Sequence, residues 1–117
     1  MAVTPPMAVV EMEEFLNHSK AILSEDARGD LIAHLGANPE AGRLVSGTGG
    51  VRKIRWATSG RGKRGGARVI YYYYNPSLPL FALDIYAKNE KANLSEADKR
   101  SLKRLLPILV SRYRKRK

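Results

Sequence analysis

The sequence of 117 residues contains no cysteine. A disulfide framework, a thiol nucleophile and a cysteine-ligated metal site are therefore excluded. No apolar run approaches the roughly 20 residues that cross a membrane, and residues 1–6 lack the basic and apolar stretches of a secretory signal. These absences favour a single cytoplasmic domain over residues 1–117 without membrane attachment. We expect residues 1–6 to be disordered.

Acidic residues are scarce in the second half of the chain. Lysine and arginine total 21 against 11 acids, which gives a net charge of +10, and residues 51–117 hold 18 of the cations but only four acids. A domain whose positive charge is concentrated in one half of the chain attracts polyanions. In the cytosol the natural polyanion is nucleic acid. A basic surface that only keeps the domain in solution is the alternative. Residues 112–117 form a basic tail that would bind an acidic partner or simply be solvated.

The first half of the chain predicts one short strand and two helices. The strand is expected at residues 7–12, and the first helix around residues 15–23. Ser24, followed by two acids, has the pattern of an N-cap that starts the second helix. This helix carries Leu31, Ile32 and Leu35 on one face and is expected to end near residues 36–39.

The second half changes to strand periodicity. Residues 51–58, 67–74 and 80–88 are β-branched or aromatic runs separated by turns, and they predict an antiparallel meander. Ser95 and Asp98 have the spacing of a helix start, and four leucines at helical spacing follow. We expect Pro107 to kink or end that helix. The predicted fold is therefore α+β: a small antiparallel-type sheet, made of a three-strand meander plus the short N-terminal strand, with N-terminal helices packed on one face and a C-terminal helix.

Alternation along the strands divides their side chains between two faces. One face is expected to be apolar and covered by helices, with Ile54, Trp56, Val69, Tyr71, Tyr73, Phe81, Leu83, Ile85 and Ala87. The other is expected to be open, with Lys53, Arg55, Arg68, Tyr72, Tyr74, Asp84, Tyr86 and Lys88. Cations beside phenol rings suit RNA, because cations bind phosphates and rings stack on unpaired bases. The predicted RNA-binding residues are Arg52, Arg61, Lys63, Arg64, Tyr72 and Tyr86.

Signals for other chemistry are few. His18 and His34 have no partner at metal-ligand or triad spacing, so both are predicted to be ordinary helix residues. The glycine-rich residues 60–66 lack the phosphate-loop pattern and are expected to form a flexible basic turn. We predict no metal site and no cofactor.

Three spaced segments, residues 50–56, 65–72 and 85–95, resemble the RelE/ParE toxin superfamily and, within it, the HigB-like branch. The resemblance covers about residues 7–106. It implies a RelE-like fold and a toxin that enters the ribosomal A site and cleaves mRNA. It also implies a cognate antitoxin, often with a HigA-like helix-turn-helix domain, that neutralises the toxin and alone contacts operator DNA. The catalytic positions of the family correspond here to Lys53, Arg55, Arg68, Lys88 and Lys91.

The reaction that this resemblance implies needs no metal. An RNA 2′-hydroxyl attacks the adjacent phosphate, Arg55 and Arg68 stabilise the charge of the transition state, and a lysine moves the proton. A tyrosine that some RelE enzymes use has no counterpart in residues 92–95, and Tyr72 or Tyr86 are the substitutes. Three alternatives stay open: a ParE-like inhibitor of DNA gyrase, a non-catalytic RNA- or ribosome-binding module, and a toxin that has lost its activity.

Overall fold

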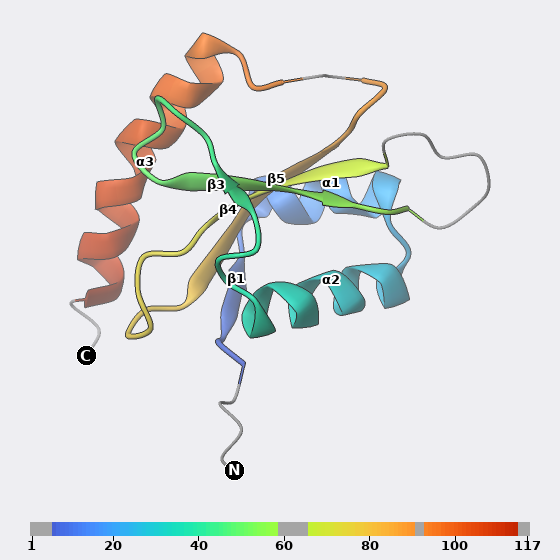
Figure 1. Cartoon of the computed structure of the whole chain (residues 1–117), viewed down its shortest axis with the longest axis horizontal. Helices are drawn as coiled ribbons and strands as arrows, with labels where there is room; N and C mark the ends of the chain where they lie inside the picture. Colours follow the sequence, from blue (N-terminus) through green and yellow to red (C-terminus); the bar gives the residue numbers. More distant parts are fainter. Residues whose placement is uncertain (1–5, 59–65, 91–92, 115–117) are drawn as a thin grey trace.

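The computed structural model describes residues 6–58, 66–90 and 93–114. In these residues the chain forms an α+β fold with a single sheet of strand order β1-β5-β4-β3-β2 (Figure 1). The predicted fold class is confirmed. The elements are β1 (Val9–Glu11), α1 (Glu13–Ile22), α2 (Glu25–Ala37), β2 (Arg43–Leu44), β3 (Val51–Trp56), β4 (Ala67–Tyr72), β5 (Leu80–Ala87) and α3 (Glu96–Arg114).

The predicted meander forms the centre of the sheet. β3 pairs antiparallel with β4, and β4 pairs antiparallel with β5. The N-terminal strand is present, but β1 runs parallel to β5, so the sheet is mixed. A fifth strand, β2, pairs antiparallel with β3 and was not predicted. Its two residues are too few for the period-2 pattern that identifies a strand.

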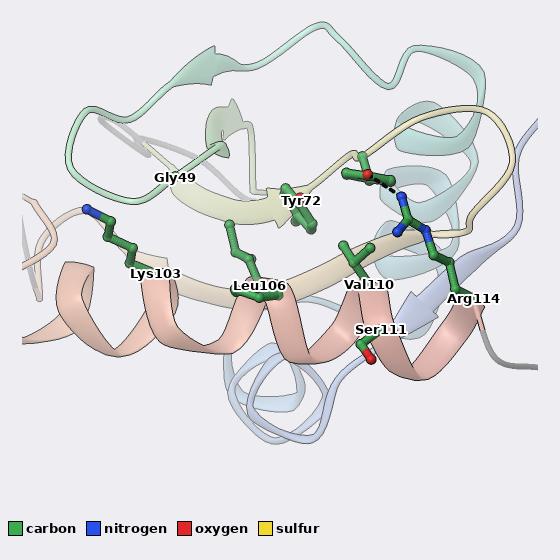
Figure 2. Close-up of a pocket in the computed structure, with 9 residues that line it drawn as sticks. Gly49, Tyr72, Lys103, Leu106, Val110, Ser111 and Arg114 are labelled. Carbon is green, nitrogen blue, oxygen red and sulfur yellow. Dashed lines mark hydrogen bonds between the residues drawn. The ribbon is translucent and has the colours of Figure 1, made fainter.

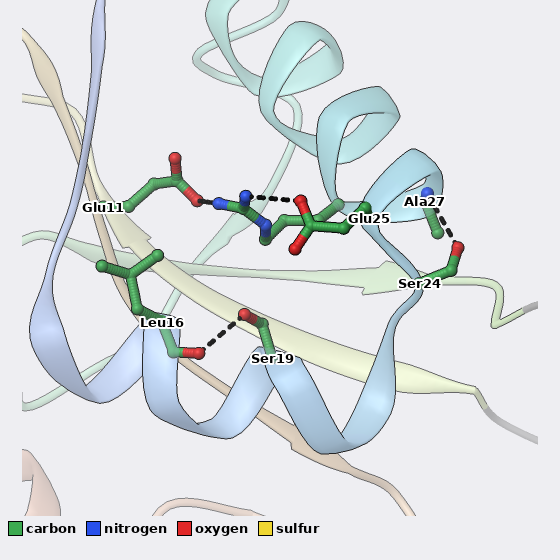
Figure 3. Close-up of polar contacts among 7 residues, drawn as sticks. Glu11, Leu16, Ser19, Ser24, Glu25 and Ala27 are labelled. Atoms are coloured by element: carbon green, nitrogen blue, oxygen red, sulfur yellow. Dashed lines mark hydrogen bonds and ion pairs between the residues drawn. The ribbon is translucent and has the colours of Figure 1, made fainter.

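Helices α1 and α2 cover one face of the sheet. Phe15 of α1 and Leu31 and Leu35 of α2 are fully buried in one core. Their sheet neighbours in this core are Ala67, Val69, Tyr71, Leu80, Ala82 and Ile85. The predicted cap is confirmed, because the Ser24 hydroxyl accepts a hydrogen bond from the Ala27 amide at 3.1 Å (Figure 3).

An ion-pair network fixes α2 to β1. The guanidinium of Arg28 donates to carboxylate oxygens of Glu11 in β1 and Glu25 in α2 (Figure 3). The hydrogen bonds with Glu25 and Glu11 raise the pKa of Arg28. Beside this network the buried Ser19 hydroxyl donates to the Leu16 carbonyl at 3.0 Å and thereby satisfies a polar group inside the layer.

Helix α3 covers the opposite face of the sheet (Figure 1). Leu106 and Leu109 of α3 pack there against Val51, Ile70, Tyr72, Phe81, Leu83 and Tyr86. The expectation of an open face is therefore wrong where α3 lies. Tyr72 is only 7% exposed and Tyr86 only 6%, so neither ring presents a free surface for base stacking.

A β-bulge changes the facing of β5. Ile70 pairs with Asp84 whereas Tyr71 pairs with Ala82, so Leu83 is an extra residue in β5. The predicted single apolar face of β5 is wrong for this reason. Phe81 and Leu83 belong to the core under α3, whereas Ile85 belongs to the core under α1 and α2.

Helix α3 begins as predicted and continues past Pro107 to Arg114. The Ser95 hydroxyl accepts from the Asp98 amide at 3.0 Å, and the Asp98 carboxylate accepts from the Ser95 amide at 3.2 Å. Pro107 lies inside the helix, which continues to Arg114, so of the two expectations for Pro107, a kink or an end, the end is excluded. Leu106 and Leu109 are buried on either side of it, and their burial offsets the hydrogen bond that a proline cannot make.

The two segments predicted at the chain ends lie partly outside the described residues. Residues 112–114, expected in a basic tail, form the last turn of α3, and residues 115–117 lie outside the described part. Most of the segment predicted to be disordered, residues 1–5, also lies outside it. In the described part, no helix combines the length and the apolar character needed to cross a membrane.

Candidate functional site

Strand register places a group of cations on the α3 side of the sheet. Arg55 of β3 lies directly opposite Arg68 of β4, and Arg68 lies opposite Tyr86 of β5. Lys53 of β3 lies opposite Arg43 of β2. Residues opposed across a ladder point to the same face. These four cations therefore share the face that α3 covers farther along the strands.

The cations line one cleft of about 570 Å³. Four predicted catalytic residues, Lys53, Arg55, Arg68 and Lys88, meet there, although they come from three different strands or strand ends. No carboxylate is among the described residues of this lining. The full lining is Ala41, Arg43, Lys53, Ile54, Arg55, Arg68, Lys88 and Asn93.

The cleft has a buried arginine and a more exposed rim. Arg68 is only 6% exposed, whereas Arg43, Arg55 and Lys88 are exposed. The ammonium of Lys53 donates to the Asn93 side-chain oxygen at 3.4 Å, which directs it across the cleft. A guanidinium at depth and several cations at the rim concentrate positive charge in the cleft, and this arrangement favours an anionic ligand.

The segment that carries Arg43 is held from the far face of the sheet. The Tyr71 hydroxyl accepts a hydrogen bond from the Gly42 amide at 2.7 Å, and Arg52 donates to the Gly42 carbonyl at 2.8 Å. A Cβ at Gly42 would lie 2.9 Å from the Tyr71 ring and 3.0 Å from the Lys53 carbonyl. Only glycine fits, so the chain approaches the sheet closely and Ala41 and Arg43 reach the cleft.

Three of the predicted RNA-binding residues lie outside the cleft. Arg52 lies opposite Tyr71, on the face away from the cleft, and it donates to the main-chain carbonyls of Gly42 and Glu40. These hydrogen bonds hold the chain segment that leads into β2, so the predicted RNA-binding role of Arg52 is not supported. Tyr72 and Tyr86 are buried under α3 and do not line the cleft. Arg61, Lys63, Arg64 and Lys91 lie outside the described residues.

Two cleft residues were missed by the sequence analysis. Arg43 lies in the two-residue strand β2, which has too little periodicity to be recognised, and Asn93 lies in a connection without regular structure. A weak signal for Asn93 was present, because it falls in the segment where the family's tyrosine is absent. For Arg43, the sequence offered no indication of a place in the cleft other than its positive charge.

The two histidines lie apart from the cleft. His18 is in α1 as predicted, but it has a partner, because its Nδ1 lies 2.6 Å from an Asp84 carboxylate oxygen. His34 is in α2, with its ring centroid 5.3 Å from that of Trp56. Nowhere in the described ranges do three histidine, aspartate or glutamate side chains form a set that could hold a metal ion.

The fold and the cleft define a small basic α+β protein with a cationic cleft on its sheet. A family model described as the RelE toxin of the RelE/RelB toxin–antitoxin system matches residues 40–116, which is more than half of the chain and includes every lining residue of the cleft. The chain belongs to the RelE toxin family. It is a toxin of a toxin–antitoxin system, and its partner is a RelB-like antitoxin.

Proposed function

We propose that this toxin is a ribosome-dependent endoribonuclease that cleaves mRNA in its cationic cleft. The observation that carries the proposal is the convergence of Lys53, Arg55, Arg68 and Lys88 on one cleft without a described carboxylate. An RNA phosphate is the anion that such a site binds, because guanidinium groups match its oxygens in pairs. The single-stranded mRNA in the ribosomal A site supplies it.

The reaction is an internal transfer within the RNA. The 2′-oxygen attacks the adjacent phosphorus, the bond between phosphorus and the 5′-oxygen breaks, and a 2′,3′-cyclic phosphate and a 5′-hydroxyl result. Negative charge accumulates on the phosphate oxygens in the transition state. Arg68, at depth, and Arg55, directly opposite it, stabilise this charge.

Proton transfer falls to the lysines of the cleft. The 2′-hydroxyl must lose a proton, and the 5′-oxygen must gain one. Lys53 of β3 is held by Asn93, and Lys88 directly follows β5, so the two lysines reach the cleft from opposite sides of β4. We assign the proton transfers to these two lysines: one, as a neutral amine, accepts the proton of the 2′-hydroxyl, and the other, as an ammonium, donates a proton to the leaving 5′-oxygen. The buried Tyr72 and Tyr86 take no part.

Dependence on the ribosome follows from the composition of the cleft. Its described lining contains neither histidine nor a carboxylate, so it favours charge stabilisation over strong acid–base catalysis. Such a site gains most from a partner that fixes the 2′-oxygen in line with the breaking bond. The proposal places the reaction in the ribosomal A site. It also includes a cytoplasmic location for the toxin and a HigA-like antitoxin that alone contacts operator DNA.

Primer extension on an mRNA in a reconstituted translation reaction tests the proposal. Wild type is compared with Arg68→Ala and with Arg55→Gln, each with and without ribosomes. Arg104→Gln is the matched control, because it removes one exposed cation of α3 outside the cleft. We expect ribosome-dependent cuts from wild type and Arg104→Gln. We expect at least a 100-fold loss from Arg68→Ala and from Arg55→Gln, in line with the loss of one transition-state donor.

Two results contradict the proposal. If a folded Arg68→Ala protein arrested growth as strongly as wild type, the cleft would not be required for toxicity. Growth arrest by wild type without any mRNA cleavage would direct attention to DNA gyrase or to simple ribosome binding. Circular dichroism of each variant shows whether a lost activity reflects a lost fold.

A further inference from the structure

Arg43 lines the cationic cleft but has no part in the reaction proposed above. It lies in β2, at the edge of the sheet, and its side chain is exposed. Within the described part of the chain, its guanidinium has no hydrogen-bond or ion-pair partner. By contrast, Arg28, Arg52 and Arg114 each donate to an acceptor in the chain. Arg43 is therefore a cation of the cleft that is ready to take an external anion.

We propose that Arg43 binds the mRNA phosphate next to the scissile one, so that the cleft holds two consecutive phosphates of one strand. This inference rests on the proposed nuclease function and adds a substrate-binding residue to the same cleft. Arg43 takes no part in bond breaking. It holds the RNA strand from one nucleotide away, in the ground state and in the transition state alike. Phosphate contacts of this kind position a nucleic acid without reading its sequence.

The spacing of the arginines in the sheet fits two neighbouring phosphates. Arg43 lies directly opposite Lys53, and Arg55 follows Lys53 by two residues on the same face of β3. Arg43 and Arg55 are therefore diagonal neighbours, whose backbone positions lie about 7–8 Å apart. Consecutive phosphates of an RNA strand are joined through one ribose and lie at a comparable separation. One strand can thus present a phosphate to each of the two arginines.

The scissile phosphate does not need a third arginine. A phosphodiester has two non-bridging oxygens, and Arg55 and Arg68 lie directly opposite each other, where they can bind both. Arg43 lies one strand farther from Arg68, beyond β3. The ribose that joins the two phosphates carries one of the two oxygens that exchange a proton in the reaction. Lys53, between Arg43 and Arg55, lies at this point of the strand.

The backbone around Arg43 is held in place before any RNA binds. The Gly42 amide donates to the buried Tyr71 hydroxyl at 2.7 Å, and the Gly42 carbonyl accepts from Arg52 at 2.8 Å. Arg43 itself belongs to β2, which pairs antiparallel with β3. A fixed backbone thus carries an unengaged guanidinium. Such preorganisation lowers the entropic cost of binding, because only the side chain has to be ordered.

Helix α3 makes the other end of this sheet face unsuitable for the RNA strand. Leu106 and Val110 of α3 form an apolar wall beside β4 (Figure 2). Arg114, at the end of this wall, already donates to the Tyr74 hydroxyl at 2.7 Å (Figure 2). Apolar side chains do not compensate phosphates for the loss of water. A strand that crosses the cleft therefore leaves it more favourably over β2, where Arg43 is exposed.

Single-turnover cleavage of ribosome-bound mRNA separates binding from chemistry. The full-length toxin is added in excess to ribosomes programmed with a synthetic mRNA, and the cleavage rate is measured as a function of toxin concentration. For Arg43→Gln we expect the half-saturating concentration to rise about 10-fold, as for a lost hydrogen bond to a charged group. The saturating rate should change by less than about 3-fold, because the contact is equal in ground state and transition state. Arg55→Gln should instead lower the saturating rate.

Two controls and one conservative variant accompany Arg43→Gln. Leu44→Gln changes the neighbouring residue of β2, which is 63% exposed and lies opposite Arg52 on the other face. Arg104→Gln removes an exposed cation outside the cleft. Both should match wild type in the half-saturating concentration. Arg43→Lys keeps the positive charge and should recover part of the lost affinity. Circular dichroism checks that every variant is folded.

A neutral linkage in the mRNA identifies the phosphate that Arg43 binds. One synthetic mRNA carries a 2′-deoxy methylphosphonate at the linkage on the 5′ side of the scissile one, and another carries it on the 3′ side. Each is compared with an mRNA that has a 2′-deoxy nucleotide and an ordinary phosphate at the same place. We expect one of the two neutral linkages to raise the half-saturating concentration of wild type about 10-fold. The same linkage should have no further effect in Arg43→Gln.

Short RNA analogues test the second phosphate without the ribosome and without cleavage. A 2′-O-methyl trinucleotide with two phosphates and a dinucleotide with one are each titrated into the toxin and followed by NMR. Wild type should prefer the trinucleotide about 10-fold. Arg43→Gln should prefer it by no more than the statistical factor for two equivalent phosphates. This measurement decides the role of Arg43 even if wild type cleaves no mRNA, a result that would contradict the nuclease alone.

Three results would overturn the assignment of Arg43. The first is an unchanged half-saturating concentration for Arg43→Gln, which would leave Arg43 a solvated cation. The second is that the losses from Arg43→Gln and from either neutral linkage add up fully, which would place a different group on the neighbouring phosphate. The third is an equal preference for the trinucleotide in wild type and in Arg43→Gln, which would limit the cleft to one phosphate.

Discussion

Arg55 and Arg68 occupy directly opposed positions on the β3–β4 ladder, so two guanidinium groups share one face of adjacent strands. Like charges in this arrangement destabilise a sheet. Arg68 is also largely withdrawn from solvent, which removes much of the screening that water would provide. A binding site for an anion explains why both positions are cationic, since the anion turns the repulsion into attraction.

Removing the charge of Arg55 should stabilise the free toxin. We expect Arg55→Gln to raise the free energy of unfolding by about 0.2–1 kcal/mol, the range for an opposed pair on a sheet. Urea denaturation of wild type, Arg55→Gln and the control Arg104→Gln measures this. The same variant should lose mRNA cleavage. A less stable Arg55→Gln protein would mean that the guanidinium makes favourable contacts that outweigh its repulsion with Arg68.

Loss of the Tyr71 hydroxyl should both weaken the fold and loosen the cleft. Tyr71→Phe leaves the Gly42 amide without its acceptor in the interior. We expect a loss of about 1–3 kcal/mol in the free energy of unfolding. Because Gly42 precedes Arg43, cleavage should fall as well at temperatures where the variant is fully folded. Tyr73→Phe is the control, and equal effects of the two substitutions would contradict a specific role for the Gly42 contact.

Stability should decline in alkaline solution because of buried tyrosines. Burial raises the pKa of Tyr72 above its ordinary value near 10, and the neighbouring Tyr74 adds to this. The folded chain thus holds the phenol proton more tightly than the unfolded chain. The associated stability is present below about pH 10 and is lost as the pH rises through the pKa of the folded state.

Tyr72→Phe should make this alkaline decline shallower. Urea denaturation at a series of pH values from 9 to about 11 gives the slope of stability against pH for wild type and variant. Part of the slope should remain, because burial also raises the pKa of Tyr71. Tyr73→Phe controls for the loss of a phenol elsewhere. An identical slope for wild type and Tyr72→Phe would show that Tyr72 keeps its proton equally in both states.

Replacing Pro107 should stabilise α3. Pro107→Ala restores an amide donor for the Lys103 carbonyl in the middle of the helix. Proline is about 3 kcal/mol less favourable than alanine in a helix interior, and its restriction of the unfolded chain offsets part of this. We expect a net gain of about 1–2 kcal/mol and a rise of roughly 4 °C in Tm per kcal/mol. An unchanged or lower Tm would mean that the helix has adapted to its proline.

Local signals in the sequence predicted the local structure well. The caps at Ser24 and Ser95 were recognised because a hydroxyl in that position accepts from an amide three residues later. The meander followed from period-2 runs between turns. Lys53, Arg55, Arg68 and Lys88 were assigned from strand alternation together with family resemblance, and the structure brings their side chains to one cleft.

Features that depend on distant contacts were not predictable from local patterns. The parallel direction of β1 is set by its pairing with β5, whose partner residues lie 71 positions farther along the chain. The bulge at Leu83 reverses the facing of Ile85 without any sequence signal in the alternating run. The placement of α3 over Tyr72 and Tyr86 depends on a choice between two apolar sheet faces, and the pattern suggested only one.

The two charge classes of the chain lie in different layers. The acid-rich first half supplies α1 and α2 on one face of the sheet, while the described part of the basic second half places the cleft and α3 on the other. The protein is thus an electric dipole directed across its own sheet. The electric field of a large polyanion therefore orients the protein with its cleft toward the polyanion before the two come into contact. Added salt screens this interaction, so productive encounters should become rarer at higher ionic strength.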